Sequence, residues 1–274
     1  MISINTNIGA MAAVQNLSRT NQDLQTTQNA IATGKKVSSA KDNGAIWGIA
    51  NKMTSDVKAY DRVRESNDRA GAILDTAVAA GESIMELLNE MKSKALAATL
   101  AGLSAASQAA LNADFIQLRD QVTNTIANAS FDGANMIGAT PASAISLGDA
   151  NGGNNITIAG ANLSLGGAIV TVTATSIVDT AANAATALGL VNSSITNLGT
   201  QLATWGSGSK RIDIHRNFVG KLQDALNTGI GAITDADLSA ESAKLQSLQV
   251  KQQLGIQALS IANSSAQSAL SLFR

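Results

Sequence analysis

The chain has 274 residues, of which 45% are hydrophobic, while only 3% are aromatic and 14% are charged. Since the apolar fraction is mostly alanine, we expect a core of closely packed slender helices and not a globule centred on aromatic side chains. The 19 Lys and Arg residues nearly balance the 20 Asp and Glu residues. The net charge therefore gives no general attraction for nucleic acid or for anionic membranes.

Most catalytic and metal chemistry lacks the residues that it needs. The chain has no Cys, which excludes disulfides and thiolate nucleophiles, and its single histidine, His215, excludes a zinc motif with two histidines. We expect no enzyme, no cofactor and no bound metal. Polar residues interrupt every long uncharged run, so no membrane insertion is expected. Residues 1–18 contain no Lys or Arg, and the basic start of a secretory signal peptide is missing.

The first predicted helix covers about residues 5–33, with Leu17, Leu24 and Ile31 spaced by seven. A long helix over about residues 43–100 gives the clearest signal, because two sevenfold series run through it as an apolar seam. Only Asn67 and Asp56 are strongly polar in these series. The first series is Ile46, Met53, Tyr60, Asn67, Leu74, Gly81, Leu88 and Ala95, and the second is Ile49, Asp56, Val63, Ala70, Ala77, Ile84, Met91 and Ala98.

A third helix is predicted over about residues 104–129, folded back antiparallel on the second. The composition then changes, and Gly, Asn, Thr, Ser and β-branched residues dominate from Pro141 to about Val178. Two short strands, 155–159 and 168–174, are predicted to form a small hairpin there.

Helices are predicted again over about residues 179–229, divided near Trp205 to Gly208, and over about residues 237–272. Both ends of the chain lack charge: residues 1–18 have none, and after Lys251 none follows until Arg274. An exposed helix of a soluble monomer normally has a charged outer face. We therefore expect neighbouring copies of the same protein to cover these ends.

Several segments resemble sites of catalysis or ligand binding. Residues 38–41 and 207–210 match S-x-x-K, but the companion elements of the serine enzymes with this motif are absent. Asp149 opens a segment that faintly resembles a calcium loop without its closing Glu, and a solvated turn is the favoured interpretation. A surface or inter-subunit contact is favoured for His215. Packing is favoured over ligand stacking for Trp47 and Trp205.

Segments near both ends carry a resemblance to one family. They are residues 3–7 (SINTN), 34–43 (GKKVSSAKDN), 48–53 (GIANKM), 65–68 (ESND), 233–237 (ITDAD) and 259–263 (LSIAN). With these segments in this order, the chain resembles the bacterial flagellins over about residues 1–137 and 190–274. The large outer domains of longer flagellins have no counterpart here.

The resemblance implies a mainly α fold, in which the N- and C-terminal segments form a long antiparallel helical bundle or coiled coil with a small central β-hairpin region. It implies an inner terminal domain of residues 1–40 and 236–274. Residues 41–235 would form a helical bundle domain, with the hairpin segment at about 138–178.

The implied function is that of a self-assembling subunit of the extracellular flagellar filament, used for swimming. The implied partners are copies of the chain, other flagellins, the flagellar type III export apparatus, an export chaperone, the filament cap and hook-associated proteins. Export would occur without a cleaved signal peptide. A hook-filament junction protein, which resembles flagellin at both ends, is the alternative.

Overall fold

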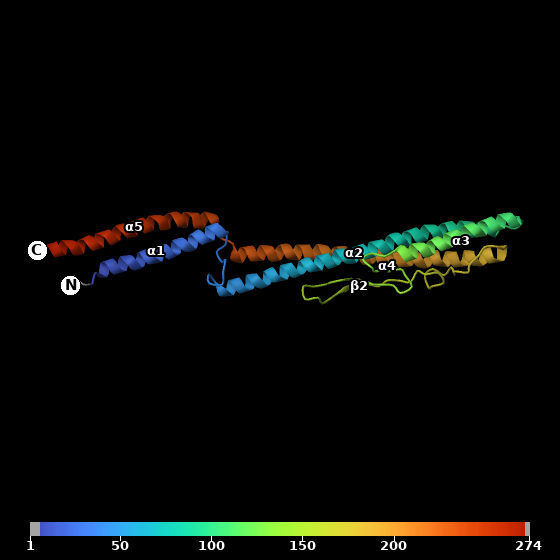
Figure 1. Ribbon diagram of the computed structural model, residues 1–274, viewed down its shortest axis with the longest axis horizontal. Coiled ribbons are helices and arrows are strands. Elements are labelled where there is room, and N and C mark those ends of the chain that lie inside the picture. The colour runs from blue at the N-terminus through green and yellow to red at the C-terminus, as the bar shows by residue number, and fades with distance from the viewer. Residues whose placement is uncertain (1–5, 272–274) are drawn as a thin grey trace. The chain divides into compact units, whose positions relative to one another are not determined.

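A computed structural model describes residues 6–271 of the chain, and its side chains as far as residue 264. The elements follow in the order α1 (Ile8–Thr33), α2 (Gly44–Ala98), α3 (Ala105–Asn128), β1 (Ala144–Ser146), β2 (Ile156–Ile158), α4 (Ala181–Thr234) and α5 (Leu238–Ser271) (Figure 1). Two compact units result. The terminal unit comprises the described residues up to Ser55 and from Ala225 onward, and the central unit comprises Asp56–Asp224. The predicted fold class, mainly α with a small hairpin, is confirmed.

In the terminal unit, α1 and α5 lie side by side and antiparallel (Figure 1). The side chain of Asn7 accepts a hydrogen bond from the first turn of α1, and Gly34, with a φ of 68°, ends the helix. The predicted start near residue 5 falls outside the described residues. Beyond the helix ends the two connections pair, since Ala236 N donates to Gly34 O at 2.9 Å and Lys36 N donates to Thr234 O at 2.8 Å.

Asp42 organises the connection between α1 and α2. One of its carboxylate oxygens accepts four hydrogen bonds, from the N–H and the hydroxyl of both Ser38 and Ser39. These donors, the backbone N–H of Ser39 first, hold the pKa of Asp42 below its usual 3.8. The domain boundary predicted at residues 40 and 41 falls in this connection, and the one at 235 and 236 falls between α4 and α5. Both boundaries remain predictions.

The core of the central unit follows the predicted seam of α2. From Val63 to Ala98, every residue of the two sevenfold series is buried. As predicted, α3 folds back antiparallel on α2, and it adds Phe115 and its neighbours on the same face to the core. The pattern fails near the start of α2, where Ile49 is 57% exposed. The seam is therefore a buried core only over its central and later turns.

The polar position of the seam, Asn67, is where the hairpin is fastened to α2. Asn67 is 1% exposed, and the hydroxyl of Ser146 on β1 donates to its side-chain oxygen. Next along the chain, Leu147 N donates to Ser66 Oγ at 3.0 Å. The hydrogen bond from Ser146 gives the buried Oδ1 of Asn67 a polar partner, while its Nδ2 has no partner among the described residues.

The pairing of the hairpin differs from the prediction. The predicted strand 155–159 contains β2, but the predicted strand 168–174 is wrong, and β1 pairs with β2 in its place. The N–H groups of Thr171 and Val172 donate to the hydroxyl of Ser194 on α4, at 2.9 and 3.4 Å. Their hydrogen bonds therefore go to a helix side chain, and this β-branched segment packs on α4 instead of joining the sheet.

The predicted division of the fourth helix near residues 205–208 is also wrong, because α4 continues through it. Trp205 is fully buried and its indole N–H donates to Ala159 O at 3.1 Å. A Cβ atom on Gly208 would lie 2.8 Å from the side chain of Ile158 on β2. This glycine thus permits close packing of the hairpin on an unbroken helix.

We expect Trp205→Ala to lower the free energy of unfolding by about 3–5 kcal/mol, because removing a fully buried ring leaves a cavity. Trp47→Ala is the matched control, since Trp47 is 41% exposed and should lose less than half as much. Urea unfolding of the full chain, followed by circular dichroism, measures both. Equal losses for the two variants would contradict the anchoring role of Trp205.

We also expect the Asp42 carboxyl group to titrate with a midpoint below 3.8. Because its pKa is depressed in the folded chain, the stability that the turn contributes is present above the unfolded pKa and is lost as the pH falls through the folded one. An NMR titration of the full chain measures the midpoint. Replacing Ser38 and Ser39 by Ala should raise it part of the way, since only the hydroxyl donors are lost. A midpoint at or above 3.8 in the unsubstituted chain would argue against this network.

Candidate self-assembly surface

Two hydrogen bonds set the register of the α1–α5 pair. Asn7 Nδ2 donates to Ala262 O and Gln252 Nε2 donates to Asn21 Oδ1, each at 2.8 Å. Between and around them the facing side chains are small or half-buried, and among the side chains described on the two helices, as far as residue 264, only Thr27, Ala30 and Leu248 are buried. The contact is narrow, so each helix covers only one side of its partner.

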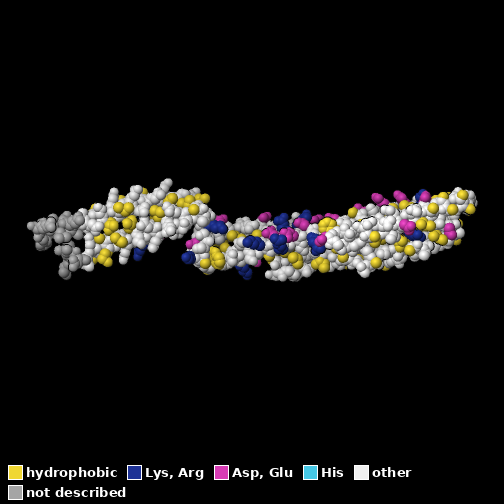
Figure 2. All heavy atoms as spheres, in the orientation of Figure 1, with side chains coloured by type: hydrophobic (Ala, Val, Ile, Leu, Met, Phe, Trp, Pro, Cys, Tyr) yellow, Lys and Arg dark blue, Asp and Glu magenta, His cyan; other side chains and the backbone are white. Residues whose placement is uncertain are grey.

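The remaining sides of α1 and α5 carry seven large apolar side chains that are 51–77% exposed. We call these surfaces the terminal apolar faces. Their residues are Ile8, Met11 and Val14 on α1, and Val250, Leu254, Ile256 and Ile261 on α5. The sequence has no charged residue from 1 to 18 or from 252 to 273. Figure 2 shows the result, an α1–α5 pair with yellow apolar and white polar surface and few charges.

Covering these faces is energetically favourable. Burying one fully exposed Ile, Leu, Met or Val side chain contributes about 1.5–3 kcal/mol. Because each of the seven has only part of its surface left to bury, together they contribute on the order of 5–10 kcal/mol before the cost of association. Lys251 is the one charged residue next to them, beside Val250 and exposed, so little ionic desolvation opposes burial of the other six. Exposed apolar patches of this kind mark sites for protein or membrane contact. Within the described residues, no helix has the length and hydropathy to span a bilayer.

The two S-x-x-K matches do not form serine–lysine pairs. The hydroxyl of Ser38 donates to Asp42, and the hydroxyl of Ser207 donates to Ala203 O of its own helix at 3.0 Å. Neither hydroxyl is hydrogen-bonded to the lysine of its motif. Both serines stabilise local backbone structure.

The other candidates also have structural surroundings. Asp149 accepts hydrogen bonds from the N–H groups of Gly153, first, and Asn151, which lower its pKa, and so it closes a turn as favoured from the sequence. The packing role predicted for Trp205 is confirmed. His215 is half-buried on α4. Over the described residues, no group of three or more His, Cys, Asp or Glu side chains is arranged to hold a metal ion.

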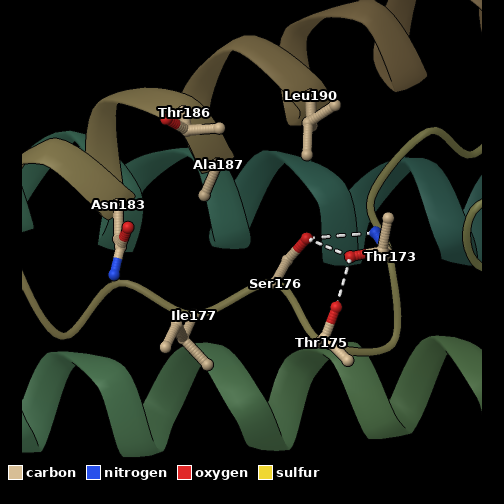
Figure 3. Close-up of a pocket in the computed structure, with 8 residues that line it drawn as sticks. All are labelled: Thr173, Thr175, Ser176, Ile177, Asn183, Thr186, Ala187 and Leu190. Atoms are coloured by element: carbon tan, nitrogen blue, oxygen red, sulfur yellow. Dashed lines mark hydrogen bonds between the residues drawn. The ribbon is translucent and has the colours of Figure 1, made fainter.

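Figure 3 shows a cavity of about 320 Å³ between the segment after β2 and the first turns of α4. Its lining has no ionisable side chain: Thr173, Thr175, Ser176, Ile177, Asn183, Thr186, Ala187 and Leu190. The hydroxyls of Thr173, Thr175 and Ser176 hydrogen-bond to one another at 2.9–3.2 Å. With its polar groups paired and no acid or base present, this cavity has no group that could transfer a proton at neutral pH.

Sequence reasoning located the uncharged ends but not the individual apolar side chains that remain exposed on them. On α5 these residues lie outside the sevenfold series Leu238, Leu245, Gln252 and Leu259. The sequence does contain a signal for them, because large apolar residues outside the seam of a helix indicate that a second face is buried.

The sequence is similar to known proteins along most of its length. The family model for the bacterial flagellin N-terminal helical region matches residues 4–141, and the model for the C-terminal helical region matches residues 188–273. Flagellin FljO of Caulobacter vibrioides is 48% identical over 272 residues, covering 99% of this chain and 98% of that protein. A flagellin of Brucella melitensis is 36% identical and is covered completely, as is this chain.

A crystal structure of Bacillus cereus flagellin is similar in fold, with a TM-score of 0.50 and 23% identity over 56% of this chain and 88% of that chain. The family resemblance drawn from the two ends is confirmed, and these comparisons do not favour the junction protein. The chain belongs to the bacterial flagellin family and is a structural subunit of the extracellular flagellar filament that serves motility.

Proposed function

We propose that the subunit enters its filament by packing its terminal apolar faces against those of neighbouring copies. The observation that carries the proposal is the set of seven large apolar side chains, each at least half exposed, of which six lie in the charge-free stretches 1–18 and 252–273. The α1–α5 pair alone leaves these side chains in water. A neighbouring copy offers a surface of the same kind, so the contact buries apolar area on both molecules.

The polymer is open because the two faces are different surfaces. A contact between the α1 face of one copy and the α5 face of the next is heterologous, and a heterologous contact that does not close into a ring produces a helical filament. Other flagellins that carry the same terminal helices would fit the same contacts. The direct partners are therefore copies of this chain and related flagellins.

Assembly would also order the terminal helices. Isolated helices are marginal in water, and most of their stability comes from packing of the apolar face. The proposed inner domain of residues 1–40 and 236–274 would thus gain stability in the filament, while the proposed helical bundle domain of residues 41–235, with its hairpin segment at about 138–178, carries its own core.

Export is the step before assembly. The chain would pass unfolded through the flagellar export apparatus with an export chaperone and without loss of a signal peptide, and would then meet the filament cap and hook-associated proteins. The family assignment supports this route, and the absence of Cys means that no disulfide hinders threading. The role would be structural throughout, without catalysis.

The export route predicts the mass of the filament protein. Mass spectrometry of sheared filaments should find residues 1–18 still attached to the subunit. Filaments made only of subunits that lack this segment would contradict export without cleavage.

Assembly can be tested by placing charge on the faces. Leu254→Asp and Ile261→Asp should each raise the critical concentration for seeded polymerisation at least about tenfold, because burying an unpaired carboxylate costs several kcal/mol. Sedimentation of filaments after seeding measures the unpolymerised fraction.

The matched control is Ile145→Asp, because Ile145 is 54% exposed on β1 of the central unit, close to the 58% of Leu254. This variant should polymerise nearly as the unsubstituted chain does. Normal polymerisation by the two face variants would overturn the proposed role of the terminal apolar faces.

A further inference from the structure

A second apolar surface lies on the outward side of α4 in the central unit. Ile214 and Phe218, one turn apart, are 62% and 58% exposed. Ile214 follows the buried Trp205 by nine residues, which at about 100° per residue places it on the opposite side of the helix. Phe218 lies beside His215, with the two ring centroids 6.3 Å apart. The pair therefore points away from the core of its own unit.

Cations flank this apolar pair. Lys210 and Arg211 lie one turn before Ile214, Lys221 lies one turn after Phe218, and all three are exposed. Among the described residues, none forms an ion pair with these three side chains. We call the five residues the α4 ridge. It is an apolar and basic surface without a partner inside the subunit.

The neighbouring cation of α4 behaves differently. Arg216 bonds Asp68 of α2 at 3.0 Å and lies 3.7 Å from Asp213. It is two residues from both Ile214 and Phe218, or about 200° round the helix. Thus α4 turns its paired cation toward α2 and its unpaired cations away from α2.

An acidic counterpart lies on α2 of the same unit. Asp75, Glu82, Glu86 and Glu90 are exposed, share one side of the helix, and form no ion pair with any described residue. Figure 2 shows carboxylates along the edge that α2 forms. Like charges four residues apart destabilise a helix by about 0.2–0.5 kcal/mol per pair. We call these four residues the acidic stripe; within the described part of the subunit no cation pairs with it.

The α4 ridge and the acidic stripe match in length as well as in charge. At about 1.5 Å per residue, the ridge extends roughly 16 Å and the stripe roughly 22 Å along their helices. Ala79 is exposed between Asp75 and Glu82. Its small side chain leaves room on the stripe for a large apolar side chain of the α4 ridge. Within one subunit, Asp75 at the start of the stripe lines a groove with Ser209 and Arg216 of α4, but no ridge residue forms an ion pair with the stripe.

We propose that the α4 ridge of one subunit docks on the acidic stripe of α2 in a neighbouring copy. The proposal rests on the proposed assembly of the filament and names a second contact within it. Because ridge and stripe are different surfaces, this contact is also heterologous and is compatible with an open polymer. The opposite charges of ridge and stripe would fix the register between neighbouring subunits, which the apolar contacts of the terminal faces do not specify.

Charge reversal of the full chain tests the contact. The ridge variant carries Lys210→Glu, Arg211→Glu and Lys221→Glu, and the stripe variant carries Glu82→Lys, Glu86→Lys and Glu90→Lys. Each should raise the critical concentration of seeded polymerisation at low salt about tenfold or more, because like charges then face each other. The chain with all six changes should recover, since its ridge and stripe are again opposite in charge. Added salt should reduce the differences.

The matched control reverses three exposed lysines elsewhere, Lys41, Lys52 and Lys58, to Glu, and should polymerise nearly as the unsubstituted chain does. Thermal unfolding of each monomer, followed by circular dichroism, checks that the central unit is folded. Ridge and stripe variants that polymerise normally, while Ile261→Asp does not, would overturn the docking contact and leave the proposed function intact. The docking contact would also be overturned if the ridge variant lost seeded polymerisation and the chain with all six changes did not regain it. The ridge would then bind a different partner.

Discussion

The antiparallel packing of α1 on α5 leaves one side of each helix without a partner in the subunit, and the properties of this chain follow from that constraint. Leu254 and Ile261 are apolar and more than half exposed, and they lie in a stretch, residues 252–273, that has no charged residue. A monomer gains nothing from such a surface, whereas a polymer of the proposed kind would bury it repeatedly. On this proposal the low charge at the ends serves the filament and not the fold of the single chain.

The central unit differs from the α1–α5 pair, because it has a buried hydrophobic core of its own. The seam of α2 is buried from Val63 onward, and Trp205 of α4 is fully enclosed. A buried polar contact, Asn67 with Ser146, fastens the hairpin at one position along this apolar seam. Polar contacts at single core positions specify register better than they add stability. Charges are confined to the outside, where the α4 ridge and the acidic stripe are left for other molecules.

The helices could be predicted from the sequence because heptad periodicity is a strong local signal over many turns. The strand partner could not, since Ala144–Ser146 is only three residues long and the β-branched segment near Val172 is a better strand by composition. What decides is non-local: Ser194 accepts the backbone hydrogen bonds of that segment. Gly208 similarly predicts a break in α4 from the sequence alone. In the structure it is the site where the side chain of Ile158 packs closely on the helix.

The candidate surface was predictable in part. Missing charge at both ends indicated that the ends are covered, but the sequence does not show which apolar side chains the α1–α5 contact leaves exposed. The α4 ridge required the structure, because charge alone does not distinguish the paired Arg216 from the unpaired Arg211. Pairing depends on which side of the helix meets α2.

Hydrogen–deuterium exchange of monomer and filament, compared peptide by peptide, tests the central claim most directly. We expect amides of α1 and α5 to exchange rapidly in the monomer and to be strongly protected in the filament, while amides of α2 between Val63 and Ala98 are protected in both. Equal protection of α1 and α5 in the two states would contradict it, because the terminal helices would then be complete without neighbouring copies.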